Sequence, residues 1–184
     1  IDHIINDYTA YDLIGEDSEQ LLDKIKELHP DVIIGNPPYN YDGKIVYGQF
    51  VEIAKSIGPR FISMLIKANW FSGGLKLDDF RNSMLSERRI RILHDYPDPD
   101  TYFKGPTTLR GGICYFLWDS EYDGKCLVFN HINGHTNTKE RFLKEGDLDI
   151  FIRYHLGISI LEKVLAKNEK SIMEGAFTRN AFKL

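Results

Sequence analysis

DVIIGNPPY, residues 31–39, carries more structural information than any other segment of this chain. Its first half, residues 31–35, is a short apolar run that is typical of a buried strand. The strand would end in Asn-Pro-Pro-Tyr, residues 36–39, which places a polar acceptor, a rigid backbone and an aromatic ring at the carboxyl edge of a sheet. Open α/β sheets bind their ligands at that edge, so we expect a functional site there.

The residues of this turn suit a reaction at a planar amino group, above all the exocyclic amine of adenine. The lone pair of such an amine is delocalised, and two acceptors on its N–H groups make the nitrogen more reactive. The side-chain oxygen of Asn36 and the carbonyl of Pro37 are candidate acceptors, held by the restricted backbone of proline. Tyr39 offers a ring on which an extruded base can stack. A proline-rich turn without function is the alternative.

Residues 31–40 resemble motif IV of the amino-group DNA methyltransferases. The similarity continues through residues 61–71, as the next strand and turn, and through residues 102–118, as a later loop and strand. Together these segments are similar to the gamma-class N6-adenine DNA methyltransferases of type II restriction–modification systems, including those fused to a nuclease. The resemblance implies methyl transfer from S-adenosylmethionine to the N6 amine of a flipped adenine in double-stranded DNA.

The same resemblance assigns roles to single residues. It implies that Asn36, Pro37 and Tyr39 are catalytic, and that Phe103 holds the adenine ring from the side opposite Tyr39. A loop aromatic packed on the core is the alternative for Phe103.

The cofactor half of such a site is not evident in this sequence. The family binds S-adenosylmethionine through a glycine-rich turn, and the first 42 residues contain only Gly15 and Gly35. The resemblance implies that Asn36 and an acidic strand end contact the cofactor; Asp7 is the candidate acid and Asp12 its rival, although both also suit a solvated loop. We therefore expect a fragment or a split enzyme whose isolated chain is inactive and binds S-adenosylmethionine weakly.

The apolar pattern predicts an α/β fold. Helical spacing occurs near residues 21–28, 46–57, 77–85 and 158–165, and strands are expected at residues 31–35, 61–66, 90–93, 113–118 and 126–129. Asp123-Gly124 predicts a hairpin turn between the last two strands. The expected fold is a partial class I (Rossmann-like) methyltransferase sheet with a late antiparallel hairpin.

Two regions are expected along the chain. Residues 1–131 would form the C-terminal part of the methyltransferase catalytic domain. Residues 132–184 would form a loop, polar over residues 131–139, and a helix that leads toward a possible target-recognition region.

The composition indicates a globular protein with a substantial core, since 42% of the 184 residues are hydrophobic. No apolar stretch is long enough to span a bilayer and no signal peptide is visible, which predicts a cytoplasmic bacterial or archaeal protein without a membrane partner. Two cysteines without a Cys-x-x-Cys pair predict no disulfide framework. No metal is expected, because Cys114, Cys126, His131 and His135 lack the close ligand pairs of a zinc site.

The net charge of −4 is unusual for a DNA enzyme, but the charge is unevenly distributed. Residues 60–110 hold nine Lys or Arg against six acids. A solvated, charged surface is favoured over a phosphate-binding patch for the arginines of this region. These arginines are Arg81, Arg88, Arg89 and Arg91.

Other functions remain open from the sequence. Protein glutamine methyltransferases and RNA adenine methyltransferases use the same Asn-Pro-Pro-Tyr, although the match over residues 102–118 favours DNA. A catalytically silent DNA-binding fragment is a third hypothesis, supported by the missing glycine-rich turn. Besides double-stranded DNA, the expected partners are a missing N-terminal cofactor-binding portion and a nuclease domain of a full-length protein.

Overall fold

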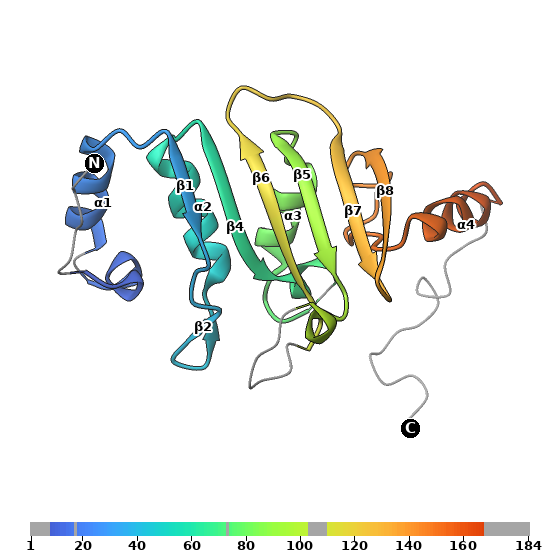
Figure 1. Cartoon of the computed structure of the whole chain (residues 1–184), viewed down its shortest axis with the longest axis horizontal. Helices are drawn as coiled ribbons and strands as arrows, with labels where there is room; N and C mark the ends of the chain where they lie inside the picture. Colours follow the sequence, from blue (N-terminus) through green and yellow to red (C-terminus); the bar gives the residue numbers. More distant parts are fainter. Residues whose placement is uncertain (1–7, 17, 73, 103–109, 168–184) are drawn as a thin grey trace. The chain divides into compact units, whose positions relative to one another are not determined.

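The computed structural model describes residues 8–16, 18–72, 74–102 and 110–167. The chain divides into two compact units, the first ending at Arg153 and the second starting at Tyr154. The first unit contains a six-stranded sheet with the order β1-β4-β6-β5-β7-β8 (Figure 1). The α/β fold expected from the sequence, a partial class I (Rossmann-like) methyltransferase sheet, is confirmed.

The directions of the strands define two edges of this sheet. Its strands are β1 (Val32–Gly35), β4 (Phe61–Lys67), β5 (Ile90–Tyr96), β6 (Ile113–Asp119), β7 (Cys126–Ile132) and β8 (His135–Arg141). β1 is parallel to β4, and β6 is inserted antiparallel between β4 and β5. The ends of β1, β4 and β5 therefore meet the start of β6 at one edge, which we call the carboxyl edge. The opposite edge is called the amino edge.

The late antiparallel hairpin exists, but Asp123-Gly124 does not form its turn. β6 and β7 are not neighbours, because β5 lies between them and pairs with both. The hairpin joins β7 to β8 through Asn133 and Gly134, whose φ angles of 50° and 76° suit a two-residue type I′ turn. The expectation of a long loop over residues 131–139 was therefore wrong, since these residues complete β7 and form most of β8.

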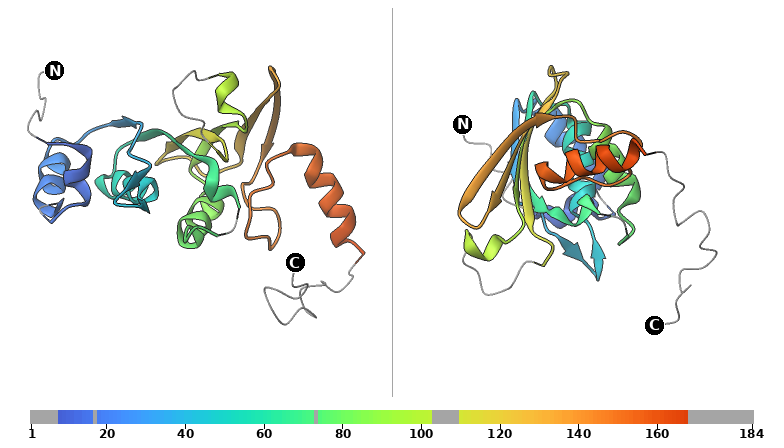
Figure 2. Two further views of the ribbon diagram at one scale, coloured as in Figure 1. Left: turned by 90° about the horizontal axis from the view of Figure 1, so that it is seen from below. Right: turned by 90° about the vertical axis from the view of Figure 1, so that its right-hand side faces the viewer.

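Two helices, α2 (Tyr47–Ile57) and α3 (Asp78–Ser86), lie on the same face of the sheet (Figure 2). Alternate strand residues point to this face and bury their side chains in the core, with Ile62, Met64, Leu93 and Phe116 among them. η1 (Ala10–Ile14) and α1 (Ser18–Glu27) precede the sheet, and α4 (His155–Leu165) belongs to the second unit. All four expected helices are thus confirmed. Among the described helices, none is long and apolar enough to cross a bilayer.

β1 is more exposed than the sequence predicted. The side chains of Val32 and Ile34 are 49% and 79% exposed, whereas Ile33 packs against the core. Among the described strands, β1 pairs with β4 alone, so it forms one end of the sheet. The expectation of a fully buried strand was therefore wrong for one of its two faces.

Candidate functional site

The turn formed by residues 36–39 leaves β1 at the carboxyl edge, as the sequence predicted. The side chain of Asn36 is exposed, and within the described part of the chain it has no hydrogen-bond partner. Pro37 and Pro38 are half-buried, and neither has an N–H group to donate. The amide oxygen of Asn36 is therefore free to accept a hydrogen bond from a ligand.

A short hairpin that the sequence did not reveal holds Tyr39 in place. β2 (Asn40–Tyr41) pairs with β3 (Lys44–Ile45) across a turn whose two residues, Asp42 and Gly43, both have positive φ. The backbone N–H of Val46 donates to the carbonyl of Tyr39 over 3.1 Å, which closes the loop that contains this hairpin.

The ring of Tyr39 is half-buried and packs edge-to-face on Tyr47, with 6.4 Å between ring centroids. Burial raises the pKa of the Tyr39 hydroxyl, so this side chain stays neutral at physiological pH. It is therefore suited to apolar contact with a ligand ring rather than to proton transfer.

Lys67, the last residue of β4, is a component of this site that sequence reasoning missed. Its Nζ lies 6.0 Å from the centroid of the Tyr39 ring. None of the carboxylates described in the structure forms an ion pair with it. A lysine that ends an apolar strand was visible in the sequence, but its position beside Tyr39 depends on the pairing of β4 with β1.

Gly111 and Gly112 bring the start of β6 against the end of β4. Their φ angles are +89° and +84°, and the carbonyl of Gly112 accepts a hydrogen bond from the Ala68 N–H over 3.0 Å. A Cβ atom at Gly112 would lie 2.6 Å from the carbonyl oxygen of Tyr96. Glycine is needed at this position for both its backbone conformation and its lack of a side chain.

A buried ion pair supports this junction. Asp95 is fully buried, and its Oδ2 contacts Arg153 Nε at 2.9 Å and Asn130 Nδ2 at 3.2 Å. Arg153 also donates from Nη2 to the carbonyl of Gly111 over 3.0 Å. Burial raises the pKa of Asp95 to about 6, an effect that the charge of Arg153 only partly offsets.

The remaining residues predicted for the site are not brought to this edge by the described structure. Asp7 and Phe103 lie outside the described residues. Asp12 is exposed, and its carboxylate accepts hydrogen bonds from the N–H and the hydroxyl of Thr9, which lower its pKa. Asp12 therefore caps η1, and a role in binding S-adenosylmethionine gains no support from these contacts.

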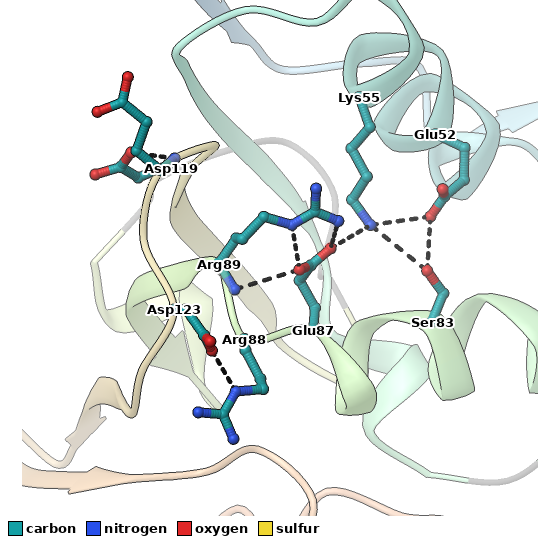
Figure 3. A network of polar contacts seen from close by, with 9 residues as sticks. Glu52, Lys55, Ser83, Glu87, Arg88, Arg89, Asp119 and Asp123 are labelled. Carbon is teal, nitrogen blue, oxygen red and sulfur yellow. Dashed lines mark hydrogen bonds and ion pairs between the residues drawn. The ribbon is translucent and has the colours of Figure 1, made fainter.

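The arginine cluster is neutralised by carboxylates. Arg88, Arg89 and Arg91 are exposed, as the sequence analysis favoured, whereas Arg81 is buried, so the expectation of a solvated side chain was wrong for it. Its ion pairs are Arg81–Asp78, Arg88–Asp123, Arg89–Glu87 and Arg91–Asp119. Figure 3 shows the part of this network at the amino edge, where Glu87 lies between Arg89 and Lys55. These arginines therefore have little free charge for a phosphate.

The cysteines are separated in the sheet and chemically shielded. Cys114 lies in β6 and Cys126 in β7, with β5 between those strands. Both thiols are buried and free, and burial raises their pKa values. No cluster of three or more His, Cys, Asp or Glu suited to a metal occurs among the residues that the structure describes.

Comparison with known proteins gives one family, a curated relative and several solved structures of similar fold. Residues 3–103 match the Eco57I restriction-modification methylase family. An uncharacterized adenine-specific methylase of Mycoplasma pneumoniae is 31% identical over 133 residues, which is 65% of this chain and 31% of that protein. The chain thus spans less than a third of the length of this curated relative.

Two solved structures are similar at low sequence identity. The type IIG restriction endonuclease BpuSI is 14% identical with a TM-score of 0.45, and the match covers 61% of this chain and 16% of that one. A type I restriction-modification methyltransferase subunit from Streptococcus thermophilus is 12% identical with a TM-score of 0.43, covering 77% and 32%.

Proposed function

The chain belongs to the Eco57I restriction-modification methylase family, and on this basis we propose that it is the methyl-acceptor part of a DNA adenine methyltransferase. The reaction would transfer a methyl group to the N6 amine of an adenine rotated out of duplex DNA. The observation that carries this proposal is the unpaired Asn36 side chain, which follows β1 at the carboxyl edge and precedes two prolines. The similarity to the Mycoplasma pneumoniae adenine-specific methylase supports adenine as the target.

Asn36 and Pro37 would bind the amine through their oxygens. The Asn36 Oδ1 atom and the Pro37 carbonyl would each accept one N–H of the amino group, which favours a more tetrahedral and more nucleophilic nitrogen. The rigid prolines fix the direction of these acceptors before the substrate binds. Such preorganisation stabilises the positive charge that develops on the nitrogen during methyl transfer.

Tyr39 would hold the adenine ring. Its own ring is fixed by the contact with Tyr47, so little conformational entropy is lost when a base stacks on it. Stacking of a base on an aromatic side chain contributes about 1–3 kcal/mol. We propose Phe103 for the opposite side of the base, as the family resemblance implies.

S-adenosylmethionine would supply the methyl group in the form of a sulfonium. The described residues fit the acceptor side of such a site, where Asn36 is also the proposed contact to the cofactor. They do not form a pocket for the donor, since no glycine-rich turn precedes β1 in this sequence and Asp7 lies outside the described residues. We therefore propose that a further portion of a longer or separate polypeptide binds the cofactor, and that the isolated chain is inactive.

Expression of the complete reading frame in a host without adenine methylases tests the function. Single-molecule sequencing of the host DNA should find N6-methyladenine at one sequence context, and Asn36→Ala should abolish it. Asn137→Ala is a matched control, because Asn137 is exposed on β8 and should not affect methylation. Methylation that survives Asn36→Ala would exclude the proposed role of Asn36.

The same experiment separates the alternatives. A folded protein that leaves DNA unmethylated would favour a protein glutamine or an RNA adenine as the methyl acceptor. A catalytically silent fragment would instead bind DNA with an affinity that falls with salt and does not depend on the cofactor.

A further inference from the structure

A pocket opens at the carboxyl edge, close to the turn formed by residues 36–39. Its volume is about 430 Å³, which is within the range of small-ligand sites. Its walls come from η2 (Ala68–Phe71), from the turn before β6 and from residues 150–153. η2 begins directly after Lys67, whose ammonium lies beside Tyr39, so the pocket and the proposed adenine site are neighbours.

The pocket contains an unfilled hydrogen-bond acceptor. Asn69 lines it, and the Asn69 Oδ1 atom is buried without a hydrogen-bond partner in the described part of the molecule. A buried acceptor without a donor is unfavourable, and such atoms are rare in folded proteins. This atom is enclosed beside Gly111 in the present side-chain conformation, so a ligand in the pocket would donate an N–H group to it after a rotation of the Asn69 amide, which would remove this deficit.

The other walls suit a flat, largely apolar group. Phe71, Leu75 and Ile150 line the pocket. Only 5% of Phe71 is exposed, and the Arg153 guanidinium lies over its ring, 5.0 Å from the centroid, so the guanidinium offers the flat face. Nucleobases combine such a face with N–H donors on their edges, and they stack readily on aromatic and guanidinium groups. The lining thus matches a nucleobase in shape and in polarity.

The charge at the pocket also matches a nucleotide. Arg110 lines the pocket, is exposed, and forms no ion pair with a described carboxylate. Lys67, between the pocket and Tyr39, is likewise without a described carboxylate partner. By contrast, Arg88, Arg89 and Arg91 at the amino edge are all paired, whereas Arg110 and Lys67 are free to contact a phosphate.

We propose that this pocket binds a nucleotide that flanks the target adenine in the same DNA strand. The base donates an N–H to Asn69, its phosphate contacts Arg110, and Lys67 contacts the phosphate between the two nucleotides. This proposal rests on the proposed function. The adenosine of a cofactor has similar chemistry, so the experiments must separate it from a DNA nucleotide.

Binding of a fluorescently labelled single-stranded oligonucleotide to the 184-residue chain tests the two polar contacts. Arg110→Gln should reduce the slope of log affinity against log salt by about 0.7, the value for one phosphate contact on a single strand. Asn69→Leu should weaken binding roughly three- to tenfold without changing that slope. Arg88→Gln is the matched control at the amino edge, where both quantities should remain as in the parent chain. Unchanged binding in both pocket variants would overturn the proposal.

Photo-crosslinking locates the base even if the Asn69 variant fails to fold. An oligonucleotide carrying 5-iodouracil should crosslink to Phe71 of the parent chain, as mass spectrometry of the peptides would show. S-adenosylhomocysteine in excess should not compete with this crosslink. Competition would assign the pocket to the adenosine of the cofactor, and crosslinking to Tyr39 without Phe71 would also overturn the proposal.

A methylation assay of the full-length protein distinguishes this proposal from the proposed function. If methylation depends on Asn36 while Arg110→Gln and Asn69→Leu bind and methylate DNA normally, the pocket proposal fails and the function stands. If Phe71 crosslinks to DNA while no adenine is methylated, the pocket stands and the reaction assigned to Asn36 fails.

Discussion

The two edges of the sheet shift the pKa of a largely buried carboxylate in opposite directions. At the amino edge, burial acts to raise the pKa of Glu87, but hydrogen bonds from Arg89 and the charge of Lys55 outweigh it and lower the pKa. At the carboxyl edge, burial prevails over the charge of Arg153, and the pKa of Asp95 rises to about 6. The amino edge thus stabilises the charged form of its carboxylate, whereas the carboxyl edge keeps the unfilled acceptor Asn36 and two cations, Lys67 and Arg110, without a described carboxylate partner, as a binding site requires.

Gly112→Ala should have the largest effect of the changes considered, because it distorts the carboxyl edge directly. A Cβ atom would lie 2.6 Å from the Tyr96 carbonyl, and the φ angle of +84° is unfavourable for alanine. We expect a loss of about 3 kcal/mol in the free energy of unfolding, measured by urea denaturation. The matched control is Gly134→Ala in the β7–β8 turn, where φ is also positive but no atom lies within 4 Å of the added Cβ. Equal losses in both variants would mean that the close approach to Tyr96 is unimportant.

Asp95→Asn should change how stability depends on pH. The folded pKa of Asp95, about 6, lies above the ordinary value of 3.8, so the folded state holds the proton more tightly. The contribution of Asp95 to stability therefore falls as the pH rises from about 4 to about 6, by about 3 kcal/mol. The variant should lose this decline, which urea denaturation across that pH range would measure.

His94, on the opposite face of β5, partly masks the effect of Asp95. Burial, and then the charge of His131, lower the pKa of His94 from 6.5 to about 4. The unfolded state therefore binds the proton more tightly, and the His94 contribution rises with pH between about 4 and 6.5. Solvent screening limits it to about 1–2 kcal/mol. The free energy of unfolding of Asp95→Asn should thus increase with pH between about 4 and 6. A free energy that decreases with pH in that variant would contradict the raised pKa assigned to Asp95.

Tyr39→Ala should lower kcat/KM for methylation by about ten- to a hundredfold, since stacking on a base contributes about 1–3 kcal/mol. Tyr39→Phe keeps the ring and should remain close to the parent enzyme. Steady-state kinetics of the full-length protein would measure both. A large loss in Tyr39→Phe would show that the hydroxyl is needed, contrary to a stacking role.

Arg88→Gln should have the smallest effect. Arg88 and Asp123 form an exposed ion pair at the amino edge, with side chains 55% and 75% exposed. Exposed pairs contribute little, so we expect a change below about 1 kcal/mol in thermal denaturation and none in methylation. A strong loss of methylation would place the DNA at the amino edge and remove the distinction between the two edges.

Local signals in the sequence predicted most of the elements but not all of their partners. Periodicity located the four helices and five of the six strands of the sheet, but it missed β8. Two dipeptides that form type I′ turns, Asp42-Gly43 and Asn133-Gly134, were visible in the sequence but were not used. Asp123-Gly124 was used, yet it joins strands that do not pair, because strand pairing is decided by the whole sheet rather than by the turn.

In the candidate site, too, the residues of a local motif were predicted and those brought in by strand pairing were not. Asn36, Pro37 and Tyr39 are contiguous, so their motif and the preceding strand predicted their location. Their chemical roles remain predictions, as do those of Asp7 and Phe103. Lys67 joins the site through the pairing of β4 with β1, and Asn69 meets the turn before β6 through the pairing of β4 with β6; no local pattern encodes these long-range pairings.

The exposed face of β1 has a practical consequence for handling this chain in solution. Among the described strands none but β4 pairs with β1, which leaves one backbone edge of β1 open beside the apolar side chains of Val32 and Ile34, and such strands promote self-association. The strand at the opposite end, β8, is protected by polar residues, including Lys139 and Glu140. Concentrated samples should therefore aggregate through β1, and Ile34→Lys should raise the concentration at which the chain stays dispersed.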